Sequence, residues 1–169
     1  MPLSEMLLPE FDHEMANTRK ALERIPDTGL QWKPHQKSWS MGELATHLAN
    51  IPSWTPLLMS TETFDLAPVE GKAPESPAPI ASAKEAVERF DQNVAVARQA
   101  ISQASDEQLL EKWTLLKGGE TVFSLPRMAV YRNMLMNHLI HHRAQLGVYL
   151  RLNDIPVPAI YGPSADEEM

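Results

Sequence analysis

Apolar residues recur every three or four positions over several long stretches of this 169-residue chain, which is the spacing of amphipathic helices. The pattern predicts a first helix over residues 4–24 and a second over residues 40–51. A third helix is predicted over residues 82–104 and a fourth over residues 124–151. The apolar stripe of the third helix is close to a heptad repeat, which is typical of helices packed in bundles.

Polar residues mark where two of these helices begin. Ser40 and Glu43 have the spacing of a capping box, and Ser82 and Glu85 have it again. In this motif the serine hydroxyl accepts a backbone hydrogen bond and the glutamate reaches back to the serine N–H. Pro52, soon after the second helix, predicts a break or a bend at that point.

Two segments between the predicted helices have non-helical patterns. Residues 64–80 hold four prolines, which predicts an extended, partly polyproline-like loop crossing from the second helix to the third. Residues 112–124 surround a Gly-Gly pair and predict a small β-hairpin. A two-stranded ribbon is marginally stable alone, so this hairpin must rest on the helices.

The predicted fold class is all-α: an antiparallel four-helix bundle with a long crossover between helices 2 and 3 and a small β-hairpin before the last helix. A single domain over residues 1–169 is expected, because a chain of this length has room for one core. Trp32 and Trp39 are expected to fold onto that core, since large aromatic side chains are costly to expose. The acidic tail 162–169 is expected to fray unless a neighbouring element holds it.

The composition argues against several classes of function. The chain has 15 basic and 22 acidic residues, a net charge of −7 and no basic run, so nucleic acid is not an expected partner. It has no cysteine, which excludes disulfides, thiolate metal sites and a cysteine nucleophile. The first residues lack the pattern of a signal peptide, and no apolar run approaches membrane-spanning length. We therefore expect a soluble cytoplasmic protein.

Three of the six histidines lie within five residues of one another in the last predicted helix. His138 and His142 are one helical turn apart and point to the same side, while His141 points away from that line. Leu135 shares the side of the pair, so this side should face the core. Two such imidazoles can grip one divalent metal ion from the same direction, but a third ligand must come from another element.

His47 is the candidate for the third ligand, because it lies between Leu44 and Ile51 on the inward side of the second helix. Taken alone, a histidine on an apolar helix face is more often a buried, hydrogen-bonded residue than a ligand. Three imidazoles together would leave coordination positions open for water or substrate, as catalytic sites require. Imidazole suits Zn, Ni, Fe or Co, and the residues do not choose among them. His13 and His35 are expected at the surface.

Other polar residues near these histidines are candidates for supporting roles. Glu43 precedes His47 by one turn and could orient its ring, although the capping box is the simpler use for that carboxylate. Arg143 and His141 are expected to point outward or into an interface. Three side chains are candidates for orienting the ligands or handling protons: Tyr131, Gln145 and Glu43.

Segments 39–49, 137–151 and 154–166 resemble the DinB-like superfamily, the DinB/YfiT group of metal-binding bundles. The first segment reads Trp-Ser-Met-Gly-Glu-Leu-Ala-Thr-His-Leu-Ala, and the second holds the histidine pair. The order of elements agrees over nearly the whole chain. The resemblance implies a four-helix bundle, often a homodimer, with a divalent metal held by three histidines. These carry over to His47, His138 and His142.

The resemblance also suggests two kinds of function. Members of the wider superfamily include thiol-dependent transferases and isomerases that use low-molecular-weight thiols, and proteins considered to be hydrolases. The first expectation is therefore a metal-dependent enzyme, with Zn or Ni ahead of Fe or Co, acting on a small molecule with or without a thiol cofactor. The alternative is a non-catalytic stress-response protein that binds metal or a small ligand. An open coordination position facing a pocket would favour the enzyme.

Overall fold

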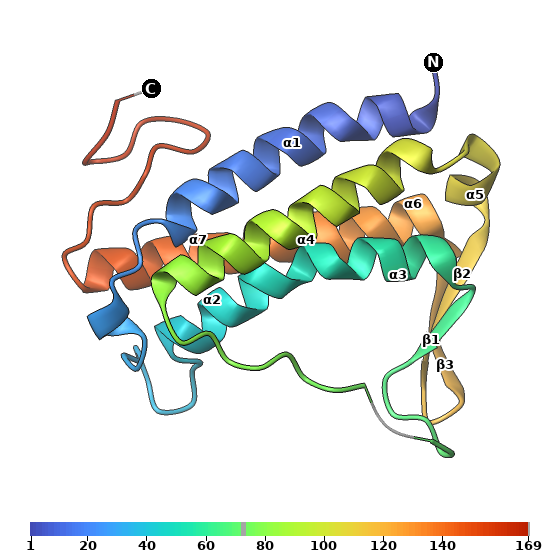
Figure 1. The fold of residues 1–169 in the computed structure, drawn as a ribbon, viewed down its shortest axis with the longest axis horizontal. Helices are drawn as coiled ribbons and strands as arrows, with labels where there is room; N and C mark the ends of the chain where they lie inside the picture. The colour runs from blue at the N-terminus through green and yellow to red at the C-terminus, as the bar shows by residue number, and fades with distance from the viewer. Residues whose placement is uncertain (72–73, 169) are drawn as a thin grey trace.

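The computed structural model describes residues 1–71 and 74–168, and the described chain is mostly helical with a small sheet at one end (Figure 1). The α-helices are α1 (Leu3–Leu22), α2 (Met41–Asn50), α3 (Trp54–Ser60), α4 (Ala83–Gln103), α5 (Asp106–Leu110), α6 (Arg127–Val130) and α7 (His138–Leu152). Two 3₁₀ turns, η1 (Asp27–Gly29) and η2 (Ile51–Ser53), and a π-helical segment, η3 (Tyr131–Asn137), join them. The strands are β1 (Thr63–Asp65), β2 (Lys112–Lys117) and β3 (Glu120–Pro126).

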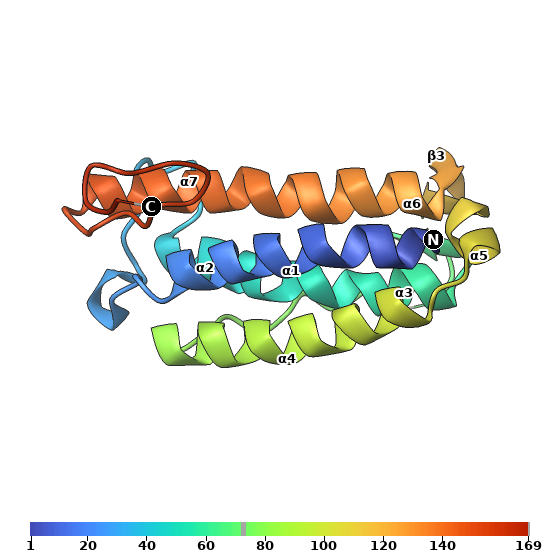
Figure 2. The ribbon, with the colours of Figure 1, turned by 90° about the horizontal axis from the view of Figure 1, so that it is seen from above.

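The long helices lie side by side along the longest axis of the molecule, as the two views of the ribbon show (Figures 1 and 2). Helix α1 packs against both α4 and α7, and α2 packs against the same two helices. Burial of their apolar stripes, which removes hydrocarbon from water, is the main force that holds them together. Fully buried side chains from all four helices meet in this core: Phe11, Leu48, Phe90 and Leu146.

Helices α2 and α4 run in the same direction, so the chain must return along the length of the molecule between them (Figure 1). The predicted crossover makes this return, and two hydrogen bonds fix the chain where it enters α4. The Ile80 N–H donates to Thr46 Oγ1 of α2 at 3.1 Å, and the Ala83 N–H donates to Asp27 Oδ1 at 2.7 Å. Residues 72–73 of this predicted loop lie outside the described residues.

The predicted hairpin is confirmed, but the prediction missed a third strand. Strands β2 and β3 pair antiparallel around Gly118 and Gly119, whose φ angles of +63° and +80° suit a two-glycine hairpin turn. Strand β1 pairs parallel to β2, so in the described chain the sheet has the order β1-β2-β3. Two residues of β1 lie in the segment predicted as a loop, because three residues are too few to reveal an alternating pattern. The all-α class is therefore corrected to mostly helical with a small three-stranded sheet.

The predicted last helix is divided into three parts. Strand β3 continues to Pro126, so the helix begins at Arg127 rather than at Ser124, and η3 lies between α6 and α7. A π-helical turn is wider than an α-turn, so each residue rotates less about the axis. Tyr131 is consequently displaced from the stripe that carries His138. The predicted end near residue 153 is confirmed.

The tail beyond α7 is held by side chains of neighbouring elements. Arg24 forms an ion pair with Glu167, and Arg151 forms one with Asp166. Asp166 Oδ2 also accepts a hydrogen bond of 2.8 Å from the Val157 N–H. The tail was expected to fray unless a neighbouring element held it, and these contacts do so. Residue 169 lies outside the described part of the chain. Within residues 1–71 and 74–168, no helix combines the length and apolarity needed to cross a membrane.

Candidate metal centre

The three predicted ligands come together between α2 and α7. His47 Nε2 lies 3.1 Å from His138 Nε2, and His138 Nε2 lies 2.7 Å from His142 Nε2. The three ring nitrogens that could act as ligands all lie within 4.8 Å of one another. In the described part of the chain, the group that could hold a metal ion here consists of these three histidines.

These distances are close to those that one bound ion would impose. Two nitrogens at about 2.05 Å from an ion lie about 3.3 Å apart at a tetrahedral angle and about 2.9 Å apart at a right angle. The His47–His138 distance of 3.1 Å falls between these values, and the His138–His142 distance of 2.7 Å is slightly shorter. Small rotations of the rings would therefore suffice to place all three nitrogens around a single ion.

The hydrogen bonds on the far sides of two rings orient their lone pairs toward the common point. His142 Nδ1 lies 2.7 Å from Gln145 Oε1, an oxygen that can only accept, so Nδ1 carries the proton. The ring of His138 is hydrogen-bonded to the backbone of Met134. With these tautomers, the Nε2 lone pairs of His138 and His142 face each other, an arrangement that needs a cation or a proton between them. The donor set therefore fits a divalent metal ion.

The environment of the site keeps these rings neutral, as metal ligation requires. Burial, followed by the neighbouring imidazoles of His142 and His138, lowers the pKa of His47 from 6.5 to about 4. Burial is also the largest cause that lowers the pKa of His138 and of His142. At neutral pH the three side chains can bind a cation without first losing protons.

These lowered pKa values predict how the stability of the metal-free protein depends on pH. Below the ordinary histidine pKa of about 6.5, the unfolded chain binds protons that the folded chain still refuses. The free energy of unfolding should therefore decrease as the pH falls from about 6.5 toward the folded-state pKa of His47, about 4. Thermal unfolding followed by circular dichroism at closely spaced pH values measures this slope.

A matched pair of variants isolates the contribution of the site to that slope. His47→Leu should make the decrease in melting temperature over this pH range shallower, whereas His35→Ala should leave the slope unchanged because His35 is exposed. Equal slopes in His47→Leu and in the unmodified protein would show that burial does not lower the pKa of His47.

Two tryptophans flank the histidines. The Trp39 ring stacks against His142 at 5.4 Å between centroids and lies 4.9 Å from the ring of His47. Trp54 lies 5.7 Å from His47 and 5.5 Å from His138. The prediction that Trp39 folds onto the core is wrong, since 45% of it is exposed. Trp39 instead covers the site from the solvent side, while Trp32 packs against the core as predicted.

Of the three residues predicted to orient the histidines, Gln145 contacts one of them, whereas Glu43 and Tyr131 have other surroundings. Gln145 holds His142, as described above. Glu43 closes the predicted capping box, accepting from the Ser40 N–H at 2.6 Å, and also pairs with Lys33 at 3.3 Å. Tyr131 is fully buried, and its hydroxyl has no hydrogen-bond partner among the residues that the structure describes. Burial, then the charge of Glu10 on α1, raises the pKa of Tyr131.

The prediction for Arg143 is wrong, because this residue points inward. Its side chain is 4% exposed and forms an ion pair of 2.7 Å with Glu14, which is 6% exposed. Tyr161 joins the pair, donating to Glu14 Oε2 at 2.7 Å and accepting from Arg143 Nη2 at 2.6 Å. The position of Glu14 within the apolar stripe of α1, between Phe11 and Thr18, was the available sequence signal for a buried partner. His141, His13 and His35 are exposed, as predicted.

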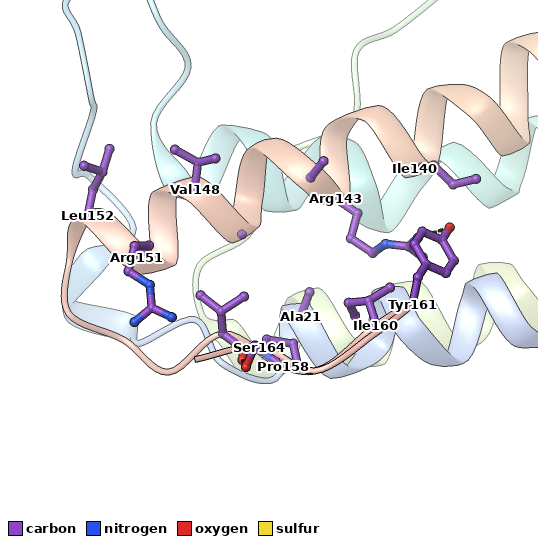
Figure 3. A pocket seen from close by; sticks show the side chains of 13 residues that line it. Ala21, Ile140, Arg143, Val148, Arg151, Leu152, Pro158, Ile160, Tyr161 and Ser164 are labelled. Atoms are coloured by element: carbon purple, nitrogen blue, oxygen red, sulfur yellow. Dashed lines mark hydrogen bonds between the residues drawn. The ribbon is translucent and has the colours of Figure 1, made fainter. Parts of the chain in front are cut away.

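A cavity of about 480 Å³ lies between α7 and the tail (Figure 3). The α7 residues that line it are spaced along the helix so that they point away from the side that carries His138 and His142. Its walls are mostly apolar, with Ile140 and Val148 from α7 and Ile160 from the tail. The charged groups beside it are already paired, Arg143 with Glu14 and Arg151 with Asp166. This cavity therefore offers no chemistry to the three histidines.

Gln145 gives a direct test of how the ligands are oriented. Gln145→Leu removes the acceptor that fixes the His142 tautomer, and we expect metal affinity to fall by about 10- to 100-fold, as for other partners of metal-bound histidines. The side chain is exposed, so the fold should tolerate the change. Gln145→Glu keeps an acceptor and should bind metal within a few-fold of the unmodified protein. Competition with a chelating dye measures both, and an unchanged affinity in Gln145→Leu would exclude this role.

Comparison with known proteins gives matches over nearly the whole chain. A family model described as the DinB superfamily matches residues 10–146. The chain is 25% identical over 163 residues to the uncharacterized protein YrdA of Bacillus subtilis (strain 168), covering 95% of this chain and 89% of that protein.

Two solved structures have similar folds. A DinB-like protein from Bacillus cereus ATCC 10987 superposes with a TM-score of 0.69 at 22% identity, covering 95% of this chain and 98% of the other. A DinB-like protein from Bacillus subtilis, YjoA, also gives a TM-score of 0.69, at 18% identity, and covers 92% and 97% of the two chains. At these identities the likeness concerns the fold.

Proposed function

Because this chain belongs to the DinB superfamily, we propose that it is a metal-dependent enzyme in which His47, His138 and His142 bind one divalent ion. The observation that carries the proposal is the convergence of three neutral imidazoles from two separate helices. Their ligand nitrogens all lie within 4.8 Å of one another. A protein that supplies three ligands leaves positions in the coordination sphere for water or substrate, which is the arrangement of catalytic rather than structural sites.

The residues around the histidines have separate tasks in this proposal. When bound, a divalent ion would lower the pKa of a coordinated water or thiol and so provide a nucleophile at neutral pH. Gln145 keeps the proton of His142 on Nδ1 and leaves Nε2 free as a ligand. Trp39 and Trp54 limit the access of solvent from two sides, which strengthens electrostatic interactions within the site.

For the bound ion we propose Zn or Ni, with Fe or Co as further candidates, since imidazole ligands suit all four. The reaction class is a transfer that uses a low-molecular-weight thiol, or a hydrolysis. The chain has no cysteine, so a thiol nucleophile would have to be a separate small molecule. Both reactions begin with the same coordination geometry.

We further propose that the helices α1, α2–α3, α4 and α6–α7 form a four-helix bundle and that the protein acts as a cytoplasmic homodimer on a small-molecule substrate. Exposed apolar side chains on the outer face of α7, Val148 and Leu152, each 58% exposed, support an interface on that side. Sedimentation equilibrium would give twice the mass of the chain, and a monomer at all concentrations would exclude the dimer.

Elemental analysis of purified protein, followed by spectroscopy of the bound metal and assays with a panel of thiols, tests the proposed function. We expect one equivalent of metal per chain, bound by three histidines and at least one exchangeable water. Turnover with a thiol would indicate a transferase, and turnover without it a hydrolase. A fourth ligand from the protein that closes the coordination sphere would instead support the non-catalytic alternative.

A further inference from the structure

A second cavity, of about 360 Å³, lies between α3, the sheet and the segment η3. Its volume is within the range of about 300–1,000 Å³ that is usual for small-molecule sites. Aromatic and aliphatic side chains from several elements form most of its walls. They include Trp54 and Leu57 of α3, Phe64 of β1, Trp113 and Leu115 of β2, and Met134 of η3.

This cavity shares a wall with two of the three histidines, His47 and His138. Trp54 lines the cavity, and its ring lies 5.5 Å from the ring of His138 and 5.7 Å from that of His47. Met134 lines it as well, and the backbone of Met134 is the hydrogen-bond partner of His138. A molecule in the cavity would therefore lie within one side chain of the proposed metal ligands.

The lining selects an uncharged, apolar occupant. Among the described lining residues, Glu75 alone has a titratable side chain. The indole N–H of Trp113 is not available to a ligand, because it donates to Thr61 Oγ1 at 3.1 Å. A buried charge without a partner would be costly in such surroundings, whereas each methylene group removed from water contributes about 0.8 kcal/mol.

We propose that this cavity binds the apolar part of the substrate, an alkyl or aryl group of medium length, while a polar head group of the same molecule reaches the metal ion. The inference rests on the proposed metal site and extends it by naming the substrate class, an amphipathic small molecule. The two aromatic walls, Trp54 and Trp113, make the apolar part the determinant of specificity. The head group alone would bind weakly and without selection.

A series of hydroxamic acids of increasing chain length tests the proposal, because the hydroxamate group binds divalent metals while the length of the alkyl chain varies. Calorimetric titration of zinc-loaded protein should show affinity rising about three- to fourfold for each added methylene from acetohydroxamic toward octanohydroxamic acid. The increase should stop when the cavity is full. Equal affinities across the series, with acetohydroxamic acid still bound, would overturn the inference while leaving the metal site intact.

Three variants test whether the alkyl chain of the hydroxamic acid binds in this cavity. Leu57→Trp, at a half-buried position, narrows the cavity and should reduce the dependence on chain length to less than twofold over the series. Leu66→Asp, at a lining position that is 48% exposed, should have the same effect through charge and can be made without disturbing the core. Ile160→Trp, at a half-buried position that lines the cavity between α7 and the C-terminal tail, is the matched control and should keep the full dependence. Loss of the dependence in the control alone would show that the alkyl chain binds in the cavity beside the C-terminal tail, and would overturn the inference.

A probe without a metal-binding head separates the cavity from the metal. Heptan-1-ol added to metal-free protein should shift the indole N–H signals of Trp54 and Trp113 in a ¹H–¹⁵N spectrum and leave that of Trp32 in place. This result is expected even if the protein binds no metal, in which case the hydroxamic acids would fail for lack of an anchor. No shift at Trp54 and Trp113 in metal-free protein would exclude the cavity as a ligand site.

Discussion

His138→Ala will reduce the affinity for a divalent metal by more than about 100-fold, since even loss of a residue that only orients a ligand costs 10- to 100-fold. His138 Nε2 lies between the other two ring nitrogens, 3.1 Å from that of His47 and 2.7 Å from that of His142. Without it the remaining pair cannot enclose an ion. His47→Ala and His142→Ala should have effects of the same order, because each removes one of three ligands. Competition titrations with a chelating dye measure the loss.

Two other histidines serve as controls for that experiment. His13 and His35 are exposed, and His13 lies on α1, where it is hydrogen-bonded to Asn17 at 3.0 Å. His13→Ala and His35→Ala should therefore bind metal as tightly as the unmodified protein. If all five variants retained the same metal content, the three histidines would not be the ligands.

Glu14→Ala will destabilise the protein by about 3–5 kcal/mol, the usual cost of leaving one partner of a buried ion pair unpaired. The Arg143 and Glu14 side chains are 4% and 6% exposed, so water cannot replace the lost carboxylate. The change would also remove the acceptor for the Tyr161 hydroxyl, which ties the tail to α1. Denaturation by urea, monitored by circular dichroism, measures the change in the free energy of unfolding.

An exposed ion pair on the same helix provides the matched control. Asp12 pairs with Arg98 at 2.8 Å, but the two side chains are 44% and 51% exposed. Asp12→Ala should therefore cost less than about 1 kcal/mol. A loss of similar size in Asp12→Ala and Glu14→Ala would contradict the assignment of Arg143 to a buried, structural network.

The convergence of His47, His138 and His142 could be predicted from the sequence because the inward side of each helix follows from the α-helical period. His138 and His142 lie on the uninterrupted helix α7, and His47 lies on α2 between two buried apolar residues. In both cases the three- or four-residue spacing determines which side faces inward. The long crossover could be predicted for a similarly local reason, the concentration of prolines after α3.

The features that the sequence did not reveal depend on contacts between distant segments. Strand β1 exists because β2 offers it a free edge, and no pattern within three residues could indicate that pairing. Arg143 is buried because Glu14, 129 residues earlier, provides its partner. Tyr131 was misplaced because a π-helical turn breaks the α-helical period on which the argument relied.

Trp39 shows that an expectation based on residue type can fail next to a functional site. A large aromatic side chain is normally buried in the core, yet Trp39 remains 45% exposed and stacks on His142. Its backbone carbonyl accepts a hydrogen bond of 3.1 Å from the Tyr149 hydroxyl, which fixes the loop beside α7. The exposed ring is thus held in place over the histidines by contacts that only the fold creates.

The most direct test of the three-histidine site is a crystal structure of the zinc-loaded protein, with anomalous scattering recorded at the zinc absorption edge. We expect one strong peak between α2 and α7, at about 2.0–2.1 Å from Nε2 of His47, His138 and His142. A peak bound by other side chains, or no peak at these histidines in protein shown to contain zinc, would contradict the account.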